Sequence, residues 1–199
     1  MIDWHPISEH REQLQTVSEL EQWTDVDPVV RDECVRVARR IVGAKVVGLL
    51  PASNDIGVPG VGVQLGLALA EVSLGTVAFV DANLRWPAIL SAEVANAEPF
   101  ATRWLRGSLA LLTPQRIQAA GAGVPQLRQL LASGSELFAH VLVDLTGFKK
   151  LGEHLAAMQL VDGVVIVARV GRTTEGELLR LGHELPASRN LGVMLTGAA

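Results

Sequence analysis

The stretch PASNDIGVPGVGVQLGLALA, residues 51–70, decides the fold of this chain. An apolar run at 46–50 precedes it, its first half is a glycine-containing loop, and its second half has the composition of a helix. A strand that enters a helix through such a loop is typical of nucleotide-binding α/β proteins. A phosphate-binding loop, however, needs a lysine followed by serine or threonine after its last glycine. This loop has neither, so its chemistry must be judged residue by residue.

Short apolar runs alternate with helical patterns along the chain. Strands are predicted at 46–50, 76–80, 108–112, 141–144, 163–169 and 192–195, and helices at 29–42, 60–73, 124–133, 150–159 and 174–185. The alternation predicts an α/β fold with a mostly parallel, doubly wound sheet and helices on both faces. Ligands of such sheets bind beyond the carboxyl ends of the strands, where the loop and Asp81 would lie. We expect residues 28–199 to form a single domain and residues 1–27 to be a peripheral N-terminal arm.

Composition narrows the classes of function. A net charge of −4 without a lysine or arginine cluster argues against binding to nucleic acid. The single cysteine, Cys34, cannot form an internal disulfide, which fits a cytoplasmic location. A polar N-terminus and the lack of a run of about 20 apolar residues argue against a signal peptide and against membrane insertion. Scattered histidines and the single cysteine predict no metal site.

The loop matches the phosphate-binding pattern only at its ends. Ala52 and Gly57 occupy the flanking positions, but Val58 stands at the lysine position and Pro59 at the hydroxyl position. Valine carries no charge, and proline lacks the N–H that would point at a phosphate. Asp55 adds a carboxylate that would repel a polyphosphate. These changes predict a phosphate site that has lost its function.

A dinucleotide-binding turn is the rival interpretation of the same stretch. Gly60 and Gly62 begin a G-x-G pattern, and Asp81 follows at about the distance expected for a ribose-binding acid. Leu65 stands where the third glycine belongs, and Gly66 comes one residue late. The short-chain dehydrogenase version also requires a tyrosine, and the chain contains none. The stretch therefore matches the dinucleotide-binding pattern only weakly.

VAFVDANLRWP, residues 77–87, and FAHVLVDLTG, residues 138–147, carry a more specific pattern. The first resembles the D-x-D-x-R motif of the bacterial tyrosine-kinase (CapB/CpsD) branch of the ParA/MinD-like ATPases, with Asp81 and Arg85 matching and Asn83 replacing the second aspartate. The second resembles that family's third motif, an apolar strand that ends in an aspartate, here Asp144. Thr196 stands where an asparagine commonly contacts adenine. The resemblance covers about residues 29–197 and implies a P-loop NTPase-like, three-layer αβα fold.

A charged pattern precedes the first strand. Glu33, Arg36 and Arg39 fit the E-x-x-R-x-x-R motif, which in the bacterial tyrosine kinases joins subunits into rings. Steps of three residues keep the three side chains near one face of a helix. The resemblance thus implies self-association, and the alternative is a solvated charged stripe.

The departures from the family decide the expected function. Without the loop lysine, the hydroxyl and the second aspartate, ATP and magnesium lose most of their ligands, so we expect no cofactor and a catalytically inactive pseudo-ATPase. Such a protein would act by binding itself, a cytoplasmic segment of a membrane polysaccharide copolymerase, or an active paralogue. The alternatives are an active ATPase or tyrosine kinase that takes its lysine from elsewhere, such as Lys45 or a neighbouring subunit, and a ParA/MinD-like positioning protein of a cell-surface or motility machine.

Overall fold

A computed structural model of the chain describes residues 23–25, 27–83, 100–114 and 121–197. At its centre is a seven-stranded sheet with the strand order β3-β4-β2-β5-β1-β6-β7. Every neighbouring pair is parallel except β3 and β4, which are antiparallel. The strands are β1 (Val46–Pro51), β2 (Val77–Val80), β3 (Phe100–Leu105), β4 (Leu109–Pro114), β5 (His140–Asp144), β6 (Gly163–Arg169) and β7 (Asn190–Thr196).

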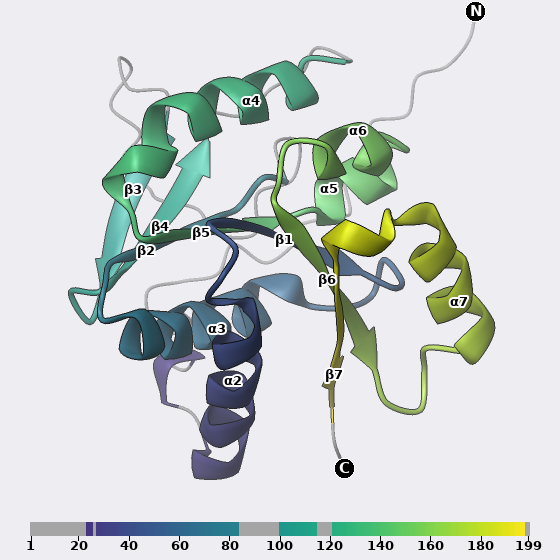
Figure 1. Ribbon diagram of the computed structural model, residues 1–199, viewed down its shortest axis with the longest axis horizontal. Helices are drawn as coiled ribbons and strands as arrows, with labels where there is room; N and C mark the ends of the chain where they lie inside the picture. Colours follow the sequence, from purple (N-terminus) through teal and green to yellow (C-terminus); the bar gives the residue numbers. More distant parts are fainter. Residues whose placement is uncertain (1–22, 26, 84–99, 115–120, 198–199) are drawn as a thin grey trace, which may run out of the picture.

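Helices cover both faces of the sheet (Figure 1). One face carries α2 (Pro28–Ile41) and α3 (Val58–Ser73), and the other carries α4 (Gly123–Gly134), α5 (Thr146–Lys150) and α6 (His154–Met158). The helix α7 (Glu175–Glu184) follows β6, and short 3-10 turns occupy Ser135–Leu137 and Ala187–Arg189. The prediction of a mostly parallel, doubly wound α/β sheet is confirmed. Within the parts of the chain that the structure describes, none of the helices is both long and apolar enough to cross a bilayer.

The helix predicted at 150–159 is confirmed only for α6 (His154–Met158), because residues 146–158 form two short helices and not one. The first, α5, begins earlier, at Thr146, and its last turn closes through Gly152 N–H donating to the carbonyl of Lys149, 3.1 Å away. Gly152 itself has a φ of 72°, a conformation that glycine adopts at little cost and that ends an α-helix. The chain then starts again as α6 at His154.

The strand β3 was not predicted from the sequence. It pairs with β4 through a tight turn in which Arg106 and Gly107 have φ values of 49° and 71°. Two consecutive residues with positive φ are typical of a type I′ hairpin turn. Because β3 is an edge strand, Trp104 stays half-exposed and the segment lacks the continuous apolar run of the central strands. The Gly107 turn was the signal in the sequence that could have identified this hairpin.

Close packing of α3 on the sheet explains the glycines in its sequence. A Cβ atom on Gly62 would lie 2.3 Å from the ring of Phe79, and one on Gly66 would lie 2.7 Å from the side chain of Leu109. Gly60 also lies inside α3, so the G-x-G pattern is part of a helix and not of a turn between strand and helix. The dinucleotide-binding interpretation is therefore wrong, since these glycines let the helix approach the strands.

Candidate functional site

The carboxyl ends of β1, β2 and β5 meet at one edge of the sheet. Leu49 of β1 is in register with Asp144 of β5, and Val80 of β2 is in register with Val143 of β5. Asp81, which follows Val80, therefore lies beside Asp144, and the loop at 52–57 leaves β1 at the same edge. This is where the sequence predicts a ligand site for an open α/β sheet.

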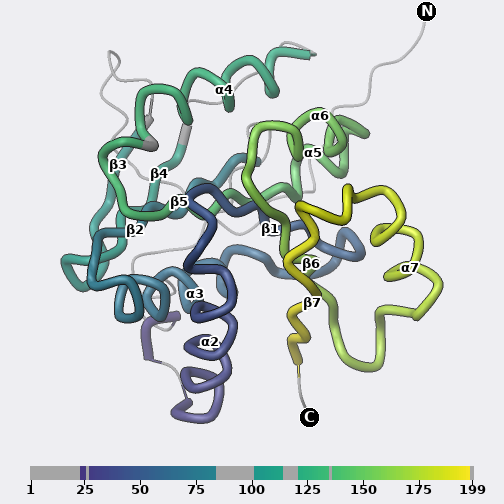
Figure 2. Tube along the Cα trace, viewed as in Figure 1, coloured from purple at the N-terminus to yellow at the C-terminus, as the bar shows by residue number. Residues whose placement is uncertain are grey.

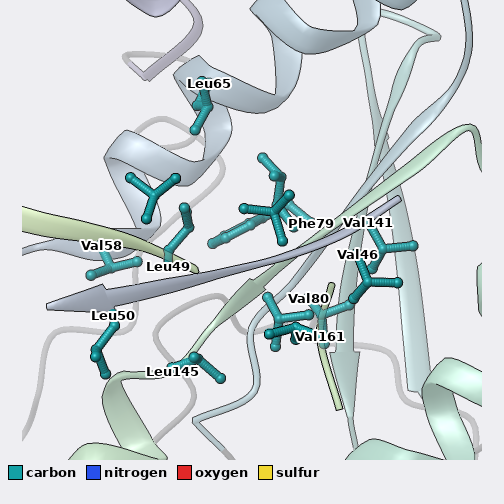
Figure 3. Packing of buried hydrophobic residues seen from close by; sticks show 14 of the residues in the cluster. Val46, Leu49, Leu50, Val58, Leu65, Phe79, Val80, Val141, Leu145 and Val161 are labelled. Atoms are coloured by element: carbon teal, nitrogen blue, oxygen red, sulfur yellow. The ribbon is translucent and has the colours of Figure 1, made fainter. Parts of the chain in front are cut away.

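The first two residues of α3 offer no free amide to an anion. The N–H of Val58 donates to the carbonyl of Ile56, 3.0 Å away, and Pro59 has no N–H to offer. The side chain of Val58 is fully buried and points into the apolar cluster beside Leu49 and Leu50 (Figure 3). Anion binding at a helix start depends on free N–H groups that point outward. The first two positions of α3 provide none.

A lysine that the sequence did not single out lies against the loop. The ammonium Nζ of Lys149, on α5, donates to the carbonyl oxygen of Pro51 at 2.6 Å and also to that of Ala52. Burial lowers the pKa of Lys149 below its ordinary value. The ammonium of Lys149 thus binds the carbonyl oxygens at the start of the loop. Carbonyl oxygens attract a cation and cannot donate a hydrogen bond to an anion such as phosphate. Its place in the first helix after Asp144 was the only signal in the sequence that pointed to it.

Asp55 lies on the outside of the loop. Its carboxylate accepts a hydrogen bond from the hydroxyl of Ser53 and lies 3.6 Å from the guanidinium of Arg172. The hydrogen bond from Ser53 is the main cause that lowers the pKa of Asp55, with a smaller contribution from Arg172. Asp55 therefore stays ionised at neutral pH, and the guanidinium of Arg172 offsets part of its charge.

Two aspartates and an amide are buried at the ends of β2 and β5. Asp144 accepts hydrogen bonds from the N–H and the hydroxyl of Thr146, at 2.8 and 2.5 Å. Burial raises its pKa to about 6, although the bonds from Thr146 act in the opposite direction. Asp81 accepts from the N–H of Asn83 at 3.2 Å. The side-chain oxygen of Asn83 is buried and has no hydrogen-bond partner among the described residues. A Cβ on Gly147 would lie 2.8 Å from this oxygen.

The other residues singled out in the sequence have structural contacts or lie elsewhere. The N–H of Ala52 donates to Val167 at 2.7 Å, and the hydroxyl of Thr196, the last residue of β7, donates to Ala168 at 3.1 Å. Lys45 precedes β1 and so lies at the opposite edge of the sheet from the loop, which makes it wrong as a replacement lysine within one chain. Arg85 lies outside the described residues. Among those described, no group of three His, Cys, Asp or Glu side chains is placed to hold a metal ion.

Glu33, Arg36 and Arg39 lie on the exposed face of α2. Glu33 and Arg36 form an ion pair one turn apart, and both side chains are more than half exposed. All three line a groove between α2 and β7. The structure thus places these residues together on one surface of the helix.

Solved structures of bacterial tyrosine kinase domains have the same fold. No protein-family model matches the chain, and no curated protein does. The BceF tyrosine kinase domain is 18% identical over 90% of this chain and 77% of that chain, with a TM-score of 0.64. The kinase domain of the Escherichia coli tyrosine kinase ETK is 21% identical over 77% of this chain and 68% of that chain, with a TM-score of 0.62. A ParA family ATPase from Chlorobium tepidum TLS is 17% identical over 77% of this chain and 74% of that chain, with a TM-score of 0.54. The resemblance stated from the sequence is confirmed for the P-loop NTPase-like fold.

Proposed function

We propose that the protein is a catalytically inactive pseudo-ATPase that works as a scaffold or regulator by binding other proteins. The observation that carries the proposal is the start of α3. There the N–H of Val58 is used within the loop, its side chain is buried in the core, and Pro59 has no N–H. A nucleotide phosphate would find neither a backbone donor nor a lysine at these positions.

The charged groups around the loop support the same conclusion. Magnesium would lack the loop hydroxyl at Pro59 and a carboxylate at Asn83, while Asp55 adds negative charge beside the site of the phosphates. Phosphoryl transfer depends almost wholly on positioning and on charge stabilisation. The residues present do not fit ATP with magnesium, so no catalytic step is proposed for this edge of the sheet.

Isothermal titration of the purified protein with ATP and magnesium tests the proposal, and we expect no saturable heat. Thermal unfolding with and without the nucleotide gives a second readout, because a bound ligand at a hundred times its Kd stabilises a protein by about 2.7 kcal/mol. A Kd in the micromolar range, about −8 kcal/mol, would contradict the pseudo-ATPase.

An active ATPase or tyrosine kinase with an unorthodox lysine is the second candidate, and the position of Lys149 favours it. Its ammonium already lies at the loop and would have to exchange two carbonyl oxygens for a phosphate. If the wild-type protein binds ATP, Lys149→Ala should then abolish binding, while Lys150→Ala, at the exposed neighbouring lysine, should not. Equal nucleotide binding by both variants would exclude Lys149 as the replacement.

We also propose that the protein associates with itself through Glu33, Arg36 and Arg39. Exposed ion pairs are individually weak, so several would have to act in a closed assembly, and salt should weaken it. Light scattering of the wild type beside an Arg36→Glu, Arg39→Glu variant checks this, with Arg128→Glu on the exposed surface of α4 as the control. Equal masses for all three proteins would leave these side chains as a solvated face.

The resemblance favours a place in polysaccharide synthesis or export. The partners would then be a cytoplasmic segment of a membrane polysaccharide copolymerase or an active paralogue, and the protein would be cytoplasmic and recruited to the inner face of the membrane. A ParA/MinD-like positioning protein would also bind partners without hydrolysis. Neighbouring genes separate these roles, since capsule and export genes favour the first and motility or partition genes the second.

A further inference from the structure

Among the described residues no strand pairs with the outer edge of β7, the last strand of the sheet, and a groove runs between this edge and α2. In Figure 2 the purple tube of α2 lies beside the yellow tube of β7. The groove has a volume of about 500 Å³ and combines cationic side chains from α2 with the apolar residues of β7. The edge of the sheet and the charged helix thus form one surface.

The free edge of β7 can accept another strand. The carbonyl of Thr196 accepts from the N–H of Val170, which directly follows β6, so the backbone groups of Thr196 point toward β6. Backbone groups alternate in direction along a strand, so those of Leu195 and Val193 point outward. The side chains of Val193 and Leu195 are 47% and 63% exposed. An open edge with exposed apolar side chains is a template for strand addition.

The helix beside this edge is positively charged. Arg36 is paired with Glu33, but Arg39 and Arg40 have no ion-pair or hydrogen-bond partner among the residues that the structure describes. The chain as a whole is acidic, with a net charge of −4, so the groove has the opposite sign to the rest of the molecule. Charge complementarity therefore favours an acidic occupant.

A second copy of this chain that pairs edge to edge at β7 does not satisfy these charges. Two copies joined edge to edge at β7 in an antiparallel pair would place their α2 helices side by side on the same face of the extended sheet. Arg39 and Arg40 of one copy would then face the same arginines of the other, and like charges at a close contact oppose association.

We propose that an extended, acidic segment of another protein adds to β7 as an eighth strand, with its carboxylates on Arg39 and Arg40. The proposal rests on the proposed function of binding other proteins and gives the chemistry of one partner. Arg40 and Leu195 are not part of the predicted self-association motif, so changes at these two positions separate partner binding from self-association.

Fluorescence anisotropy with two labelled peptides tests the proposal. The first consists of four Glu-Val repeats, which can form a strand with carboxylates on one face, and the second of four Glu-Pro repeats, which have the same charge but cannot form such a ladder. We expect the wild type to bind the valine peptide at low salt and not the proline peptide. Leu195→Pro, which removes an outward N–H, and Arg40→Glu should each weaken binding by about tenfold. Arg128→Glu, with the same change of charge on α4, should leave binding unchanged.

Several results would overturn the proposal. They are the absence of binding of the valine peptide to the wild type, equal binding of both peptides, and unchanged binding by Arg40→Glu. Because Arg40 is exposed, its substitution still tests the proposal if Leu195→Pro fails to fold. A wild-type dimer that Leu195→Pro converts to a monomer would show that a second copy fills the groove. Binding of ATP would contradict the proposed pseudo-ATPase function but not the peptide site at β7. The absence of peptide binding alone would refute the peptide site and leave the pseudo-ATPase proposal unchanged.

Discussion

Replacing the buried Asp144 by asparagine should stabilise the protein at neutral pH. Asp144 ends β5, is 1% exposed and accepts two hydrogen bonds from Thr146. An asparagine has the same shape and keeps an oxygen that can accept the backbone N–H of Thr146. The substitution therefore removes the charge and leaves most of the geometry in place.

The expected magnitude follows from the pKa of Asp144. Burial raises this pKa from 3.8 to about 6. The folded protein then binds more protons than the unfolded chain between these values, so the free energy of unfolding of the wild type falls as the pH rises through this window. The full loss above about pH 7 is about 3 kcal/mol. Below about pH 3 the carboxyl is mostly protonated in both states. There the wild type and the Asp144→Asn variant should be equally stable.

Urea unfolding at a series of pH values between 4 and 8 measures this difference. The gain from Asp144→Asn should grow with pH, whereas Asp32→Asn, at an exposed carboxylate on α2, should produce no such trend. A difference that does not vary with pH, or a variant less stable than the wild type at pH 7, would refute the reasoning. In that case Asp144 would be stabilised in its ionised form, as a magnesium ligand has to be.

Two further predictions concern α3 and the loop before it. The Val58→Lys, Pro59→Ser variant restores the lysine and the hydroxyl of the loop. We expect it to recover nucleotide binding only in part and to release no phosphate from ATP above background, because Asn83 still stands where magnesium needs a carboxylate. Hydrolysis at rates typical of the family would show that these two substitutions alone account for the loss of activity. Gly62→Ala should lower the free energy of unfolding by about 1–3 kcal/mol, because its Cβ would lie 2.3 Å from the ring of Phe79. Gly182→Ala in α7, where a Cβ meets open space, should instead stabilise the protein by up to about 1 kcal/mol; chemical denaturation of both variants measures the two effects.

The sequence was sufficient for features that depend on local pattern. Apolar runs followed by an aspartate placed Asp81 and Asp144 at the ends of neighbouring strands, because the carboxyl ends of parallel strands share one edge of the sheet. The glycine-rich loop placed the start of α3 within two residues, at Val58. Each of these features needs only the residues next to it in the chain.

Features that depend on the arrangement of distant segments could not be predicted in this way. The contact of Lys149 with the carbonyl of Pro51 requires the exact start of α5, which the pattern at 150–159 missed. The groove beside Arg40 requires knowing that β7 is the edge strand, and strand order does not follow from periodicity. The half-exposed strand at 100–105 lacked an apolar run and was therefore missed.

The residues that match the family motifs and those that depart from them differ in what the fold requires. Ala52 is buried and its N–H donates to the carbonyl of Val167, and Asp144 accepts two hydrogen bonds from Thr146 at the start of α5. Both residues therefore have a structural role without any ligand. Val58 and Asn83 stand where a lysine and an aspartate would serve a nucleotide or magnesium, and Val58 instead fills the core. The chain thus keeps residues that the fold needs and has lost residues that would bind a ligand. We expect this pattern in a protein whose fold serves to present a binding surface. This difference supports a protein that acts through partners bound on its helices and sheet edge.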